Sequence, residues 1–262
     1  MDYLKINRKL WDERTNVHYQ SEFYNVKSFL TGKDTLNPIE TDLLGDISGK
    51  KILHLQCHFG MDSISLARKG ASVTGIDFSK ESIKKARELN ELAATEVRFI
   101  ECDVYSLKDF LTEKFDIVYT SYGVVGWLPD LKKWGDVISS FLKPRGRFIM
   151  IEFHPVVWMF SDDFQKIAYN YSDSEPIIEE LEGTYTDGKS DIKSKSISWN
   201  HGLAKVINAL IDMGLNITGI QEYNYSPYDC FKNTVEIEKG KYQIAGLENR
   251  IPMLYSVTAE NP

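Results

Sequence analysis

The stretch Ile52-Leu-His-Leu-Gln-Cys-His-Phe-Gly60 decides the fold, because it joins a buried strand to a turn that closes on glycine. Residues 61–69 follow with helical character, and a second apolar run, Ala71-Ser-Val-Thr-Gly-Ile-Asp77, ends on an acid. Unpaired N–H groups and the dipole at a helix N-terminus favour an electron-rich ligand. An acid at the end of the next strand, about twenty residues on, holds the ribose diol in nucleotide-binding βαβ units. The turn and the acid together predict a cofactor that contains adenosine.

The detail of the turn distinguishes between such cofactors. A dinucleotide fingerprint needs three glycines so that the backbone can approach a pyrophosphate. Gln56 and His58 occupy two of those positions, and only Gly60 remains. The two side chains would crowd a pyrophosphate, whereas a cofactor without phosphate and with an amino-acid tail tolerates a less open turn.

At this turn the chain resembles the class I S-adenosylmethionine-dependent methyltransferases, whose first motif is commonly Asp/Glu-x-Gly-x-Gly-x-Gly after a strand. The chain departs from that motif, since His54 stands in place of the acid and Gln56 and His58 stand in place of two glycines. The resemblance implies a loop under the amino-acid portion of the cofactor, acting mostly through backbone groups. That loop would consist of Gln56, Cys57, His58 and Gly60.

Two further cofactor motifs follow in the order that the resemblance implies. The second strand ends in Asp77-Phe78, where the acid of the family binds the ribose hydroxyls. The third strand, within residues 97–103, ends in Asp103-Val104, which would frame the adenine. The carboxylate of Asp103 is then placed to accept a hydrogen bond from the exocyclic amine.

The resemblance continues through the fourth and fifth strands. Residues 114–127 contain the fourth strand and lead into the active site of the family, with Ser121 expected at the cofactor and Tyr122 near the methyl group. Residues 142–152 supply the loop and the strand that close the sheet. The resemblance covers residues 50–152 and extends more weakly to the C-terminus.

The alternation of strands and helices after residue 50 predicts an α/β fold. We expect a doubly wound, Rossmann-like, mostly parallel sheet of seven strands with helices on both faces and the last strand antiparallel. N-terminal helices and a cap inserted after the fifth strand are added to it. A single methyltransferase domain, residues 1–262, would comprise a helical lid at 1–45, a cofactor-binding core at 50–153, a cap at 154–198, and a C-terminal helix with closing strands at 199–262.

The segments after the core are expected to close the sheet. Residues 200–213 have amphipathic helical periodicity and are followed by Gly214, a common residue just after a helix. Residues 215–225 and 253–258 read as the last two strands. A long connection would join them.

Composition limits the possible partners. Of 262 residues, 42% are hydrophobic and 26% are charged, as in ordinary globular proteins. The formal net charge of -7 argues against nucleic acid as the main partner, because phosphate binding depends on clustered Lys and Arg. Three cysteines without a paired framework fit a reducing compartment. Without a signal-peptide core or a stretch of roughly 20 apolar residues, we expect a cytoplasmic protein that does not enter the membrane.

Several side chains are candidates for chemistry or for binding the acceptor. Tyr122 follows the fourth strand at the sheet edge where ligands bind. His154 ends the fifth strand and has a side chain that titrates near neutrality, so it is a candidate general base. The flanking segments are rich in aromatic residues that would form a lid over an apolar or planar acceptor, with packing as the alternative for each. These residues are Trp11, His18, Tyr19, Trp127, Trp158, Trp199 and His201.

A metal site is the weaker interpretation of the first motif. His54, Cys57 and His58 are metal-ligating residue types, but zinc needs three or four converging ligands. Alternate strand residues point to opposite faces, and no Cys-x-x-Cys motif adds a ligand. We predict no metal, and a structural hydrogen bond for His54.

Together these patterns predict an S-adenosylmethionine-dependent methyltransferase that acts on a small-molecule acceptor by direct in-line transfer. The protein would mainly hold donor and acceptor in line, which can supply about 7–11 kcal/mol of the barrier. The irregular first motif leaves open a non-catalytic module that binds the cofactor. A nicotinamide oxidoreductase is a further alternative, against which the missing glycines argue. Neither the acceptor nor the oligomeric state follows from the sequence.

Overall fold

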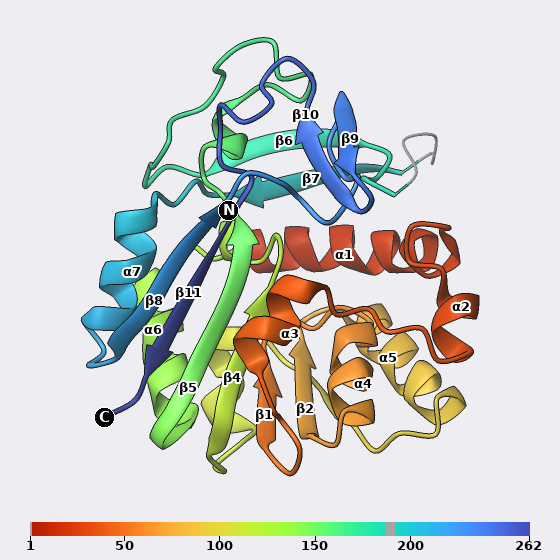
Figure 1. The fold of residues 1–262 in the computed structure, drawn as a ribbon, viewed down its shortest axis with the longest axis vertical. Coiled ribbons are helices and arrows are strands. Elements are labelled where there is room, and N and C mark those ends of the chain that lie inside the picture. The colour runs from red at the N-terminus through yellow and green to blue at the C-terminus, as the bar shows by residue number, and fades with distance from the viewer. Residues whose placement is uncertain (1, 187–191) are drawn as a thin grey trace.

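The computed structural model describes residues 2–186 and 192–262 (Figure 1). The cap that the sequence predicts at 154–198 therefore includes residues 187–191, which lie outside the described part. Strands and helices alternate through the core as predicted. In chain order they are β1 (Lys51–His54), α4 (Met61–Arg68), β2 (Ser72–Asp77), α5 (Lys80–Leu92), β3 (Arg98–Glu101), η1 (Val104–Asp109), β4 (Phe115–Ser121), η2 (Val125–Trp127), α6 (Leu131–Phe141) and β5 (Leu142–Phe153).

The seven strands of the main sheet lie in the order β3-β2-β1-β4-β5-β11-β8. The first five are parallel, with β1 between β2 and β4. Strand β11 (Leu254–Glu260) runs antiparallel between β5 and β8 (Asn216–Tyr223). The predicted doubly wound sheet with an antiparallel last strand is confirmed. Its carboxyl edge, where ligands bind in open α/β sheets, is formed by the ends of β1 to β5.

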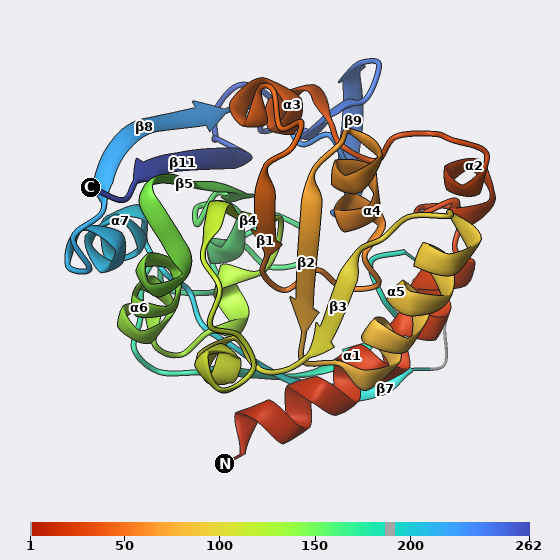
Figure 2. The same ribbon diagram turned by 90° about the horizontal axis from the view of Figure 1, so that it is seen from below.

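Helices cover both faces of this sheet (Figure 2). Because successive strand residues point to opposite faces, Ile52 and Leu53 enter two different hydrophobic cores. The core with Ile52 packs against α3, α4 and α5, and the core with Leu53 packs against α6 and α7. Both residues are fully buried, as expected for a parallel sheet covered on both faces.

Three helices precede the core: α1 (Tyr3–Gln20), α2 (Val26–Leu30) and α3 (Pro38–Leu44). Helix α1 crosses the carboxyl edge of the sheet, with the cap strands on its other side (Figure 1). It begins at Tyr3 because the side chain of Asp2 accepts a hydrogen bond from the Lys5 N–H. The amide of Asn7 exchanges two hydrogen bonds with the backbone of Ile197, at 2.7 and 2.9 Å, which fixes α1 to strand β7 (Lys193–Ser198).

The strands above α1 come from two separate segments. The first contains η3 (Val157–Met159) and an antiparallel pair of β6 (Ile177–Glu182) with β7. The second lies in the connection between β8 and β11, where β9 (Thr234–Glu238) pairs with β10 (Lys241–Ile244). The sequence indicated only a long connection there. Helix α7 (Leu203–Ile211) is followed by Gly214 at φ 82°, as its position predicted.

Candidate active site

The turn after β1 keeps the backbone of a glycine-rich loop although it carries side chains. The φ angles of Gln56, His58 and Gly60 are 54°, 52° and 79°, so all three positions are left-handed. Such a conformation costs a side-chain-bearing residue roughly 1–2 kcal/mol. At Gly60 no side chain fits, because a Cβ would lie 2.5 Å from the ring of Phe99.

Hydrogen bonds from the surrounding strands hold this turn. The Gln56 Nε2 donates to the Val124 carbonyl at 3.0 Å, while the Gln56 Oε1 is buried without a partner. The Cys57 N–H donates to the Ile76 carbonyl at 2.8 Å. The turn is thereby tied both to β2 and to the loop after β4.

Asp77 is a buried acid fixed by two backbone N–H groups. Its Oδ2 accepts from the His58 N–H and its Oδ1 from the Ser79 N–H, both at 2.9 Å. Burial raises the pKa of Asp77 to about 6, against the effect of these hydrogen bonds. A carboxylate has about four lone-pair sites. The remaining lone pairs are available to a ligand in the pocket that Asp77 lines.

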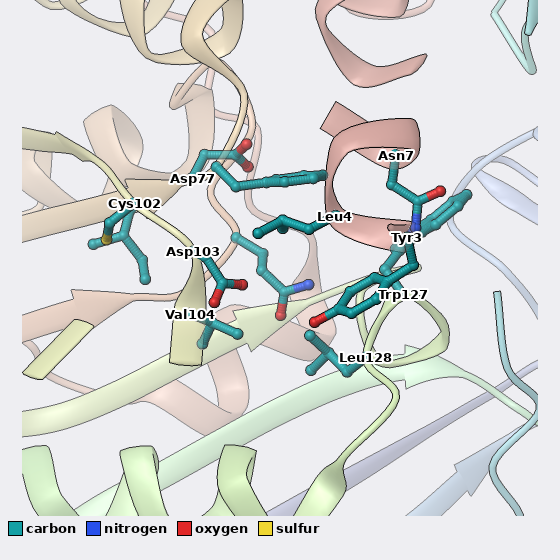
Figure 3. A pocket seen from close by; sticks show the side chains of 12 residues that line it. Tyr3, Leu4, Asn7, Asp77, Cys102, Asp103, Val104, Trp127 and Leu128 are labelled. Carbon is teal, nitrogen blue, oxygen red and sulfur yellow. The ribbon is translucent and has the colours of Figure 1, made fainter. Parts of the chain in front are cut away.

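A pocket at the carboxyl edge gathers several of the predicted cofactor residues (Figure 3). Asp77 and Asp103 lie on one side of it, and Tyr3 and Trp127 lie on the other. Its lining residues are Tyr3, Leu4, Asn7, Gln56, Ile76, Asp77, Phe78, Cys102, Asp103, Val104, Trp127 and Leu128. The contribution of Tyr3, Leu4 and Asn7 was not expected from the sequence, because the first turns of α1 reach the pocket only through the tertiary fold.

The chemistry of this lining fits an adenosine without phosphate. Two carboxylates, Asp77 and Asp103, line the pocket together with apolar side chains such as Phe78 and Val104. Burial raises the pKa of Asp103, and its Oδ2 accepts from the Tyr105 N–H at 3.2 Å. Within the described chain, no Lys or Arg lines the pocket. Arg8, the cation that acts on Asp103, stands outside the lining. A pyrophosphate would therefore meet no cation in the lining itself, whereas ribose hydroxyls and an adenine amine would find acceptors.

His58 connects the turn to α1 and α5. Its Nε2 shares a hydrogen bond with His18 Nδ1 at 3.0 Å, and its Nδ1 shares one with Ser82 Oγ at 3.0 Å. Ser82 Oγ in turn lies 2.7 Å from Thr15 Oγ1. Burial lowers the pKa of His58 to about 3 and that of His18 to about 2, so both rings are neutral at pH 7. The edge of Trp11 packs on His58, with ring centroids 5.3 Å apart.

The loop after β4 is organised by Glu152, whose role the sequence did not reveal. This buried carboxylate accepts hydrogen bonds from the N–H groups of Gly123, Val124, Val125 and Phe153. Burial nevertheless raises its pKa. The Trp127 Nε1 donates to the Gly123 carbonyl at 2.8 Å, so the same loop positions a side chain of the pocket.

Ser121 and Tyr122 stand at the end of β4, beyond the lining of this pocket. Tyr122 has φ 39°, and its hydroxyl is buried without a partner. Its ring meets the rings of Phe153 and Tyr228, with centroids 5.9 and 5.1 Å apart. Tyr228, which comes from the connection after β8, was not expected at this edge.

His154 is placed with β8 rather than with the pocket. Its Nε2 lies 2.9 Å from Glu222 Oε1, its Nδ1 accepts from the Val156 N–H at 3.2 Å, and its ring packs on Tyr255. Burial lowers the pKa of His154, although Glu222 acts in the opposite direction. Both ring nitrogens are thus engaged.

Of the predicted acceptor-binding side chains, Trp11, His18 and Trp127 come together. The rings of Trp11 and Trp127 meet edge to face at 5.5 Å, and those of Trp11 and His18 at 6.1 Å. Tyr19 is not part of this group of rings. Its ring packs instead on Phe59, with centroids 5.6 Å apart. Three of the predicted residues therefore share one side of the turn.

The remaining three predicted aromatic or imidazole side chains have other partners. Trp158 is 40% exposed and packs on Phe231 at 5.6 Å. Trp199 meets the edge of Tyr3 at 5.4 Å. The His201 Nε2 lies 2.7 Å from the carbonyl of Leu128, a pocket residue. Trp199 and His201 thus adjoin the pocket from behind its lining.

The residues weighed as metal ligands are held by hydrogen bonds. His54 Nδ1 shares one with Ser63 Oγ at 2.8 Å, which is the structural contact predicted for it. Residues 2–186 and 192–262 contain no group of three or more His, Cys, Asp or Glu side chains placed to hold a metal ion. Over the same residues, no helix combines the length and the apolar character that crossing a membrane requires.

Residues 46–205 match the sequence profile of a family described as methyltransferase domain. The match covers more than half of the chain, so the chain belongs to this family. The methyltransferase assignment made from the motifs is confirmed, and the fold is that of solved S-adenosylmethionine-dependent methyltransferases.

Curated relatives cover the chain in part. An uncharacterised methyltransferase of Synechocystis is 30% identical over 131 residues, 49% of this chain and 59% of the relative. A ubiquinone biosynthesis O-methyltransferase of Alkalilimnicola ehrlichii is 32% identical over 118 residues, 44% of this chain and 47% of the relative. The chain spans about half the length of the curated relatives it matches.

Solved structures extend the similarity of the fold to most of the chain. An S-adenosylmethionine-dependent methyltransferase of Clostridium acetobutylicum has a TM-score of 0.60 at 15% identity and covers 96% of this chain and 98% of its own. One of Mesorhizobium loti has a TM-score of 0.54 at 19% identity and covers 88% of this chain and 99% of its own. At these identities the likeness shows the fold alone.

Proposed function

We propose that this protein transfers the methyl group of S-adenosylmethionine directly to a small-molecule acceptor. The pocket of Asp77 and Asp103 carries the proposal, because its lining offers two carboxylates to an adenosine and contains no Lys or Arg for a phosphate. The same feature argues against the nicotinamide alternative. The turn supports it further, since Gln56 and His58 are left-handed at the two positions where the family commonly has glycines.

The residues of this site act by binding and positioning. Bound S-adenosylmethionine supplies a sulfonium-activated methyl group. In the proposal, Asp77 accepts from the ribose hydroxyls and Asp103 accepts from the adenine amine. Glu152 fixes the loop that carries Tyr122 and Trp127, so that the acceptor meets a preformed wall. Alignment of two reactants in this way can lower the barrier by about 7–11 kcal/mol.

The elements that cover the carboxyl edge favour a small acceptor over a macromolecule. Helix α1 lies across this edge with the cap strands above it (Figure 1). The net charge of -7 disfavours nucleic acid. Relatives named as ubiquinone biosynthesis O-methyltransferases, at 32% identity and less over about half of the chain, are consistent with a small organic acceptor. A cytoplasmic location is part of the same proposal.

Calorimetric titration with S-adenosylhomocysteine, beside NAD and ATP as controls, tests the cofactor half. We expect micromolar binding of S-adenosylhomocysteine and none of the controls. A protein that unfolds cooperatively but does not bind this ligand would overturn the proposal. Transfer of a labelled methyl group to a panel of small acceptors then separates an enzyme from a non-catalytic module, which would bind the cofactor without turnover.

A further inference from the structure

A second buried polar cluster lies beside the loop after β4. Glu40 comes from α3, Asp62 from the first turn of α4, Tyr119 and Tyr122 from the end of β4, and Tyr228 from the connection after β8. Four segments that are distant in the sequence thus converge at the carboxyl edge. None of these residues lines the adenosine pocket.

Polar atoms in this cluster lack partners. Glu40 is fully buried; its Oε1 accepts from the Asn37 Nδ2 at 3.2 Å, but its Oε2 has no hydrogen bond. The buried hydroxyls of Tyr119 and Tyr122 also make no hydrogen bond of normal geometry, although Tyr122 lies close enough to Glu40, and Tyr119 close enough to Ser121, to affect the pKa values of the two tyrosines. Tyr119 is fully buried. Buried polar atoms are rarely left unpaired. Three of them at one place indicate a ligand that supplies the missing hydrogen bonds.

The charge of the cluster indicates which kind of ligand. Burial first, and then the neighbouring Asp62, raise the pKa of Glu40 to about 7. Burial also raises the pKa of Asp62, while hydrogen bonding from Thr35 and Ser121 lowers it. The main charge interactions that shift the pKa values of Glu40, Asp62, Tyr119, Tyr122 and Tyr228 come from other acids, from phenols and from the Cys230 thiol. None of these interactions comes from a Lys, Arg or His. Two acids in a buried place without a cation favour a positively charged guest.

We propose that Glu40, Asp62, Tyr119 and Tyr122 bind the ammonium group of the methyl acceptor, so that the acceptor is a small primary amine. The proposal rests on the proposed function, since it assigns the acceptor of the same site. An ammonium group donates three hydrogen bonds, which match the unpartnered oxygens of Glu40, Tyr119 and Tyr122.

The surroundings of Tyr122 suit the carbon skeleton of such an amine. Its ring contacts Phe153 and Tyr228, and Phe153 contacts Phe231 at 5.0 Å. Rings also attract a cation over their faces. In an amine that carries an apolar or aromatic group, the polar cluster therefore suits the ammonium group and the surrounding rings suit the carbon skeleton.

The test compares two probes of equal size on protein loaded with S-adenosylhomocysteine. Phenethylamine carries the ammonium group, and 2-phenylethanol carries a neutral hydroxyl. We expect calorimetry to show at least tenfold tighter binding of the amine. Equal affinities, or no binding of either probe, would overturn the proposal. The same titrations without S-adenosylhomocysteine detect the cation site even in a protein that fails to bind that ligand, so the two failures are distinguishable.

Variants locate the preference in the cluster. Glu40→Gln removes the charge at constant size, and Glu91→Gln, on the exposed side of α5, is the charge-matched control. We expect Glu40→Gln to abolish the preference for the amine and Glu91→Gln to keep it. Tyr122→Phe serves if Glu40→Gln does not fold, and should weaken the amine about threefold to tenfold without changing the alcohol. An unchanged preference in a folded Glu40→Gln protein would contradict the assignment.

One further comparison tests whether the cluster binds the amino group of the cofactor rather than that of the acceptor. 5′-Methylthioadenosine lacks the amino-acid portion that S-adenosylhomocysteine carries. If the cluster binds the acceptor, Glu40→Gln changes the affinities of both ligands by less than about twofold. A loss confined to S-adenosylhomocysteine would mean that the cluster holds the amino group of the cofactor, and the proposal for the acceptor would be wrong.

Discussion

The backbone N–H of His58 donates to the Asp77 carboxylate at 2.9 Å, so the turn after β1 and the acid at the end of β2 form one unit. The second oxygen of the acid caps the start of the next turn through the Ser79 N–H. Asp77 thus has two roles: it orients the turn, and it presents its free lone pairs to the pocket.

Asp77→Ala should weaken the binding of S-adenosylhomocysteine about tenfold to a hundredfold, because a desolvated hydrogen bond to a carboxylate contributes roughly 1.5–3 kcal/mol. Glu101→Gln is the control, since Glu101 pairs with Asp77 in register on β3 but is exposed. Calorimetry measures both affinities, and thermal unfolding verifies that both variants fold. Unchanged affinity in Asp77→Ala would remove this acid from the cofactor site.

His58→Gly and His58→Ala should differ in stability because of the left-handed backbone at this position. Both variants lose the hydrogen bonds to His18 and Ser82. Only alanine retains the conformational penalty of φ 52°. We expect the free energy of unfolding of His58→Ala to be about 1 kcal/mol lower than that of His58→Gly in urea titrations. The opposite order would mean that the turn changes its conformation when the imidazole is removed.

His18 should make the stability depend on pH below neutrality. Its pKa falls from an unfolded value of 6.5 to about 2 because of burial, so the unfolded chain binds the extra proton between these values. The resulting stability is present above pH 6.5 and is lost as the pH falls. Between pH 6.5 and 5 the expected loss is about 2 kcal/mol.

His18→Asn isolates this contribution, because Glu40 and Asp77, whose pKa values are raised to about 7 and about 6, act in the opposite direction. Their contribution is present at low pH and is lost as the pH rises through these values. The relevant quantity is therefore the difference in unfolding free energy between the native protein and His18→Asn, measured at pH 7 and at pH 5. A difference that does not change with pH would show that His18 can protonate in the folded protein.

The sequence predicted the parallel core because its signals are local. Apolar strands, helices with regular apolar spacing and the acid Asp77 at a fixed distance from the turn are all readable in one short window. The same holds for Ser79, which caps α5 by accepting from the Ser82 N–H. Asp103 could be placed for the same reason, since it lies two residues after β3.

The other half of the site depends on contacts between distant segments. Glu40 lies on a short helix and Tyr228 in an irregular connection, and only the tertiary path brings both near Tyr122. In the sequence Glu152 is only a residue near the end of a strand. Its role depends on hydrogen bonds that form where the loop after β4 folds back over it. His154 had the right residue type and the right edge, but its partner Glu222 comes from β8. Residue type alone does not give such neighbours.

Glu152→Gln should loosen the loop after β4 without disturbing the sheet. An amide can accept with only one of its two ends, so the N–H groups of Val124 and Val125 lose a charged acceptor that now lies 2.7 and 2.9 Å away. We expect the free energy of unfolding to fall by about 3 kcal/mol, because each buried hydrogen bond to a charged group contributes roughly 1.5–3 kcal/mol. Binding of S-adenosylhomocysteine should weaken as well, since Gln56 is anchored to the Val124 carbonyl. Glu222→Gln, on the edge strand β8, is the matched control, and urea titration with calorimetry measures both effects. Equal stability of the two variants would show that other contacts hold this loop.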